Sequence, residues 1–136
     1  MNKLAIFDCD GTLVDGQASI CEAMEAAFGD AGLPLPRRHE IRRVVGLSLP
    51  HGLRRLAPEA NEEQQASVVE RYKHHFFTAR NEGRLSEPLF AGMRELLLRL
   101  HGEGWLLGVA SGKSARGLAA CLAMHGIADV FVTLQT

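Results

Sequence analysis

Two aspartates near the start of the chain have a spacing that suits phosphoryl transfer. Asp8 and Asp10 flank Cys9, and Gly11 and Thr12 follow in the segment DCDGT. One carboxylate can attack phosphorus to form an acyl phosphate, while a second carboxyl group protonates the leaving alcohol and later activates water. One group must then be ionised and the other protonated, and the two would titrate as a coupled pair. We therefore predict that this pair is catalytic, although Asp and Gly are also ordinary turn residues.

Chemistry of this kind calls for a divalent cation beside the two carboxylates. A bound Mg²⁺ keeps the nucleophilic carboxylate charged, offsets the repulsion between two anions and stabilises charge on the transferring phosphoryl group. We therefore predict Mg²⁺ as the cofactor at Asp8 and Asp10.

A second polar loop, VASGKS at residues 109–114, has the residue types of a phosphate cradle. Gly112 lets the backbone approach a ligand, and backbone N–H groups at the start of a helix attract anions. Ser111 would donate a hydrogen bond to a phosphoryl oxygen, and Lys113 would add a point charge. We predict that Ser111, Gly112 and Lys113 bind the substrate phosphate. The simpler alternative is a strand-to-helix connection with Ser114 as the helix cap.

The hydrophobic pattern predicts a short buried strand directly before each loop. Residues 3–7, KLAIF, form an apolar run that ends at the Asp/Gly cluster. Further along, we predict a helix at 92–101, a strand at 105–110, a helix at 114–125 and a strand at 130–134. This alternation predicts the α/β class with a doubly wound parallel sheet. Ligands of such sheets bind beyond the carboxyl ends of the strands, so both loops should share one crevice.

Residues 16–83 have a helical pattern throughout. We predict helices at 17–31, 39–45, 49–56 and 61–83. Asn61 and Gln64 stand at the two positions of a capping box at the start of the last of these. The chain is therefore predicted to have an α/β core domain, made from 1–15 and 84–136, interrupted by a helical insert at 16–83.

Composition excludes several classes of protein. The 136 residues are 46% hydrophobic, and 15 basic and 16 acidic residues give a net charge of −1. A real core is thus available, but no long-range field favours nucleic acid or a membrane surface, so we expect a small ligand. No apolar stretch reaches the roughly 18 residues of a membrane helix. The start of the chain turns acidic before an apolar signal-peptide region could form, so we expect a cytoplasmic protein. The three cysteines are widely spaced, which argues against a disulfide framework and a zinc site.

These motifs resemble those of the haloacid dehalogenase-like superfamily of hydrolases: DCDGTLVD at residues 8–15, and VASG around Ser111. The helical insert is similar to the small cap of the phosphoglycolate phosphatase and beta-phosphoglucomutase group. The resemblance implies that Asp8 is the nucleophile and a metal ligand, and that Ser111 binds phosphate. It also implies that Asp10 is the acid/base and lends its backbone carbonyl to the metal. Asp10 favours phosphoryl transfer, since the name-giving dehalogenases lack a second aspartate.

Two further motifs of the family would follow the third strand: a Lys or Arg that binds phosphate, and an acidic pair that completes the metal shell. Lys113 stands too close to the second motif to be the third, and Asp129 precedes the strand. We therefore expect the core as printed to be incomplete, with the first strand at an edge of the sheet, and the natural protein to continue beyond Thr136.

The function predicted from the sequence is Mg²⁺-dependent hydrolysis of a small phosphorylated metabolite through an aspartyl-phosphate intermediate. Phosphoglycolate is the first candidate substrate, by family analogy alone. Two alternatives stay open: a phosphomutase of the same fold, and a non-catalytic fragment that carries only the first two motifs.

Overall fold

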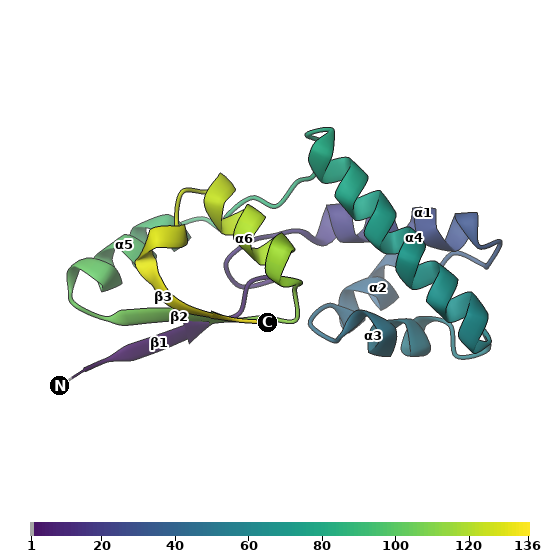
Figure 1. Ribbon diagram of the computed structural model, residues 1–136, viewed down its shortest axis with the longest axis horizontal. Coiled ribbons are helices and arrows are strands. Elements are labelled where there is room, and N and C mark those ends of the chain that lie inside the picture. The colour runs from purple at the N-terminus through teal and green to yellow at the C-terminus, as the bar shows by residue number, and fades with distance from the viewer. Residues whose placement is uncertain (1) are drawn as a thin grey trace. The chain divides into compact units, whose positions relative to one another are not determined.

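The computed structural model describes residues 2–136, which fold into two compact units (Figure 1). One unit runs through Asp15 and resumes at Glu87–Thr136, and the other is Gly16–Ser86. The α/β class predicted from the sequence is confirmed by the parallel sheet and helices of the first unit. The assignment of the two parts as a core and a cap stays a prediction.

A three-stranded parallel sheet forms the centre of the first unit. Its strands are β1 (Leu4–Phe7), β2 (Leu106–Ala110) and β3 (Phe131–Gln135), in the spatial order β1-β2-β3. β1 therefore lies at an edge of the sheet, as expected. Leu4 pairs with Leu106 and Phe7 with Val109, so β1 and β2 run side by side without a break.

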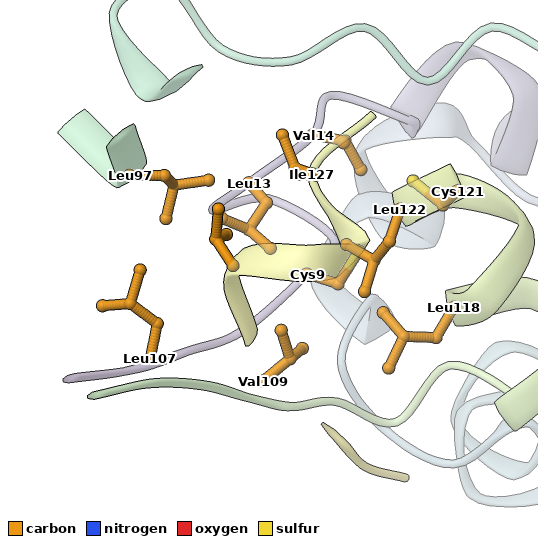
Figure 2. Packing of buried hydrophobic residues seen from close by; sticks show 11 residues of the cluster. Cys9, Leu13, Val14, Leu97, Leu107, Val109, Leu118, Cys121, Leu122 and Ile127 are labelled. Carbon is orange, nitrogen blue, oxygen red and sulfur yellow. The ribbon is translucent and has the colours of Figure 1, made fainter. Parts of the chain in front are cut away.

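Two helices, α5 (Met93–Gly102) and α6 (Ala115–Met124), cover the same face of this sheet (Figure 1). Leu107 and Val109 of β2 lie on that face and are buried against the two helices. Leu106 lies on the opposite face and is 41% exposed. The buried core of the unit consists of Cys9, Leu13, Val14, Leu97, Leu107, Val109, Leu118, Cys121, Leu122, Ile127 and Val130 (Figure 2).

The entry to β3 differs from the sequence prediction by one element. A strand was expected from residue 130, but Ala128–Val130 form a short 3₁₀ helix and β3 begins at Phe131. The turn has a packing reason. Residues three apart lie on one side of a 3₁₀ helix, so both Ile127 and Val130 reach the core.

The segment that leaves the first unit runs antiparallel to the segment that returns to it. Val14 forms an isolated bridge with Leu89. Hydrogen bonds flank this bridge: Asp15 N donates to Pro88 O at 2.8 Å, and Phe90 N donates to the carbonyl of residue 13 at 3.0 Å. The departing and returning segments are thus fixed beside each other by backbone hydrogen bonds.

The second unit is built from helices only. They are α1 (Gln17–Asp30), α2 (Arg38–Val44), α3 (Leu49–Leu56) and α4 (Glu62–Asn81). The capping box predicted for the last helix is confirmed, since Asn61 Oδ1 accepts from Gln64 N at 2.8 Å and Gln64 Oε1 accepts from Asn61 N at 3.0 Å. The core of the unit consists of Ile20, Cys21, Met24, Ala27, Phe28, Ile41, Leu53 and Val68.

The helices within residues 2–136 include none with both the length and the apolar character needed to cross a membrane.

Adjacent leucines on α5 provide a test of the packing. Leu97 is fully buried and Leu98 is 53% exposed. We expect Leu97→Ala to lower the free energy of unfolding by about 2–5 kcal/mol, because the removed atoms leave a cavity in the core. Leu98→Ala should lower it by less than about 1 kcal/mol. Urea unfolding followed by circular dichroism measures both values, and equal losses would contradict the described packing.

Candidate active site

The two polar loops singled out in the sequence lie at the same edge of the sheet. Asp8 follows β1 directly and Ser111 follows β2 directly, and these strands are parallel neighbours. The carboxyl ends of the strands therefore bring both loops together. A hydrogen bond from Ser111 N to Gln135 O, at 2.9 Å, ties the second loop to the end of β3.

The DCDGT loop is a tight turn around one carbonyl group. Cys9 O accepts hydrogen bonds from the backbone N–H groups of residues 12, 13 and 14 at 3.2, 2.9 and 3.1 Å. Gly11 has φ +83°. A Cβ at this glycine would meet no atom within 4 Å, so the positive φ alone favours glycine here. The turn buries Cys9 and leaves the flanking aspartates, Asp8 and Asp10, with access to solvent.

Asp8 is an exposed carboxylate held by its own loop. Its Oδ1 accepts a hydrogen bond from Cys9 N at 2.7 Å. No other group within residues 2–136 bonds to it in the structure. A carboxylate fixed through one oxygen can present the other to an electrophile or a cation.

Asp10 belongs to an ion network whose other two members are nearly inaccessible to solvent. Its Oδ1 lies 3.2 Å from Lys113 Nζ, and the same ammonium group lies 2.5 Å from Glu87 Oε2. The exposed fractions of these side chains are 17% for Asp10, 7% for Lys113 and 1% for Glu87. Burial opposes the charge of Lys113, but the two carboxylates outweigh it and raise the pKa of the lysine above its usual range.

The loop after β2 presents polar groups and begins a helix. Ser111 Oγ accepts a hydrogen bond from Lys113 N at 3.1 Å, which leaves the hydroxyl proton available to an anionic ligand. Ser114 caps α6, with its Oγ accepting from Gly117 N at 3.1 Å. The cap expected in the simpler alternative is therefore present. It does not conflict with the predicted phosphate-binding role of Ser111 and Gly112, which stays a prediction.

Lys113 was predicted to add a point charge for phosphate, and the structure gives its ammonium group two carboxylate partners. Glu87, the more buried of these, was missed by the sequence analysis. It lies in a loop before Pro88 and carries no periodic or motif signal. Only the fold brings it to Lys113, which is 26 residues further along the chain.

The oxygen atoms present fit a magnesium ion. No cluster of three or more His, Cys, Asp or Glu side chains with the arrangement of a metal site occurs in residues 2–136. Mg²⁺ does not need one, because it binds through one or two carboxylates and completes its shell with water and substrate phosphate. Asp8 offers a carboxylate, and the Asp10 carbonyl accepts no backbone hydrogen bond among the described residues.

Cys9 lies between the two aspartates but is unsuited to nucleophilic chemistry. It is fully buried. A hydrogen bond with Cys121, together with burial, raises the pKa of the Cys9 thiol well above its usual range. The thiolate needed for attack is thereby disfavoured.

The burial of the thiols predicts slow reaction with thiol reagents. All three cysteines are free and buried. We expect fewer than about one thiol per chain to react with Ellman's reagent within minutes in the native state, and all of them after unfolding in guanidinium. Rapid native labelling of Cys9, located by peptide mass spectrometry, would reopen a role for this thiol.

Removing the lysine of the ion network should be costly. Lys113→Met leaves two carboxylates without their cation, and we expect a loss of about 3–5 kcal/mol in the free energy of unfolding. Lys73 is the matched control. Its ammonium lies 3.9 Å from Glu70 and its side chain is 63% exposed, so Lys73→Met should cost less than about 1 kcal/mol. Chemical denaturation of both variants checks the difference, and a loss at position 113 as small as the control's would speak against the network.

Comparison with known proteins identifies the family of the chain. The family model described as haloacid dehalogenase-like hydrolase matches residues 5–136. The chain is 30% identical over 131 residues to a protein of Dickeya dadantii named probable phosphatase IndB, with 96% of this chain and 57% of that protein covered. It is 28% identical over 138 residues to a phosphoglycolate phosphatase of Vibrio vulnificus, with 96% and 59% covered.

A solved structure shares the fold. A haloacid dehalogenase-like family hydrolase of Streptococcus pneumoniae matches with a TM-score of 0.83 and 24% identity, over 98% of this chain and 60% of that one. The chain thus spans less than two thirds of the length of these relatives. The family match extends over nearly all of the printed sequence and includes both polar loops. The chain belongs to the haloacid dehalogenase-like hydrolase family.

Proposed function

We propose that the protein is a Mg²⁺-dependent phosphatase that hydrolyses a small phosphomonoester through an aspartyl phosphate on Asp8. One observation carries the proposal. An exposed carboxylate, oriented by a backbone N–H, follows β1 immediately, and a second carboxylate two residues later is held by a lysine. Family membership and the names of the relatives support the same reaction class.

Asp8 is the nucleophile in this proposal. The hydrogen bond from Cys9 N to Oδ1 fixes the orientation of the carboxylate. The other oxygen attacks phosphorus, so an O–P bond forms while the bond from phosphorus to the leaving oxygen breaks. The product of this step is an aspartyl phosphate and an alcohol.

Asp10 moves protons in both steps. It first gives a proton to the leaving oxygen, and its carboxylate then takes a proton from the water that attacks the aspartyl phosphate. That second attack releases inorganic phosphate and restores Asp8. Lys113 holds Asp10 through the contact at 3.2 Å and offsets its charge once the proton has left.

Ser111 and the start of α6 complete the phosphate site. The hydroxyl of Ser111 donates to a phosphoryl oxygen, and the backbone of Gly112 lies open to the ligand. Asp8 and the carbonyl of Asp10 would hold Mg²⁺, which supplies positive charge against the phosphoryl oxygens. The residues of this chain thereby bind, orient and protonate the substrate.

Phosphoglycolate is the first substrate to test, because the Vibrio vulnificus relative bears the name of a phosphoglycolate phosphatase. The proposed partner is thus a small phosphorylated metabolite. A cytoplasmic location forms part of the proposal, and three free thiols are consistent with it.

A phosphate-release assay tests the function. The assay uses the full-length protein, with p-nitrophenyl phosphate and phosphoglycolate as substrates. We expect release to stop with EDTA and to return with excess Mg²⁺, since the carboxylates need the cation. Asp8→Asn should abolish turnover because an amide cannot attack phosphorus, and Asp10→Asn should lower kcat by roughly 10²- to 10⁴-fold.

Asp129→Asn is the matched control, because Asp129 is exposed in the 3₁₀ helix before β3. This variant should keep the wild-type rate. Turnover by Asp8→Asn would refute the proposed nucleophile, and isomerisation of a sugar phosphate without phosphate release would favour a mutase.

A further inference from the structure

Glu87 is a buried carboxylate to which the proposed reaction gives no part. Its side chain is 1% exposed and its Oε2 lies 2.5 Å from Lys113 Nζ. A buried charge is expensive unless it is paired and hydrogen-bonded. The backbone of the residue is held as well, because His125 Nε2 donates to Glu87 O at 2.6 Å. Arg94, in turn, donates to the His125 carbonyl at 2.6 Å. Glu87 is thus a fixed anchor at the edge of the site.

Lys113 connects this anchor to the DCDGT loop. An ammonium group has three donors and points wherever its acceptors lie, so a lone lysine positions a partner poorly. With Glu87 fixed on one side, the ammonium has a defined place from which to reach Asp10 Oδ1 at 3.2 Å. The contacts join segments 26 and 103 residues apart in sequence. A long-range network of this kind is specific to the folded unit.

We propose that Glu87 is a positioning residue: it fixes Lys113, and Lys113 fixes the carboxyl group of Asp10 for proton transfer. The inference rests on the proposed phosphatase function. A proton donor must lie within hydrogen-bond reach of the leaving oxygen, and small displacements of a catalytic group are costly in rate. Glu87 therefore acts on the reaction without touching the substrate.

A merely structural role for Glu87 predicts a different outcome. If Glu87 only balances the charge of a buried lysine, its loss should reduce stability and slow every substrate alike. If it acts through Asp10, its loss should matter most where the leaving group needs a proton. An alkyl phosphate has such a leaving group, whereas p-nitrophenolate leaves without protonation.

The closing experiment compares kcat/KM of Glu87→Gln and wild type for phosphoglycolate and p-nitrophenyl phosphate in the full natural protein with Mg²⁺. We expect a loss of roughly ten- to hundredfold for the alkyl phosphate and less than about threefold for the aryl phosphate. In an Asp10→Asn background the same substitution should have little further effect, because two residues that act as a unit are not additive. Glu82→Gln is the control, since Glu82 forms an exposed ion pair with Arg84.

The possible results distinguish the failure of the positioning role of Glu87 from the failure of the proposed phosphatase function. Equal losses for both substrates, or an additive loss on top of Asp10→Asn, would overturn the positioning role while the phosphatase stands. A wild-type protein that releases no phosphate from either substrate would overturn both.

Should Glu87→Gln fail to fold, a double variant replaces it. Glu87→Gln with Lys113→Met removes the buried charge from both sides, and replacing both members of a pair is milder than breaking it. It removes the same hold on Asp10, so the alkyl phosphate should again lose more than the aryl phosphate.

Discussion

The parallel pairing of β1 with β2 is the constraint on which the site depends. The four residues of β1 lie opposite residues 106–109, so both strands reach the same edge of the sheet. Asp8 and Ser111 emerge there from neighbouring strands. A slip of one residue would exchange the two faces of β2. It would turn Leu107 and Val109 away from α5 and α6, which makes the correct register a matter of core burial as well as hydrogen bonding.

Sequence patterns predicted most of the fold because the elements are strongly marked. The apolar run before DCDGT, the helical spacing of the insert and the capping box at Asn61 depend on residues close together in the chain. Such local signals survive in the structure within a few residues. The 3₁₀ helix at Ala128–Val130 was missed because its reason is tertiary: it brings Ile127 and Val130 into a core that the sequence does not display.

The candidate site likewise contains residues that the sequence predicted and one residue that it did not. Its two loops could be found from residue types, and Asp8, Asp10 and Ser111 lie where a strand-to-loop argument puts them, although their roles stay predictions. Glu87 could not be predicted, since no pattern in the residues next to it in the sequence indicates a buried acid. Lys113 shows the limit most clearly. Its presence near the site follows from the sequence, but its orientation toward Asp10 depends on an anion supplied from a distant segment.

The antiparallel bridge between Val14 and Leu89 has a consequence for how such a protein can diversify. Backbone hydrogen bonds within the first unit hold the two ends of the intervening segment side by side. These bonds offset the entropic cost of closing that segment into a loop. Any folded segment whose two ends lie equally close together could be inserted between these two antiparallel segments. Helical segments of different sequence can therefore be exchanged as a block at this position, while the two polar loops keep their geometry.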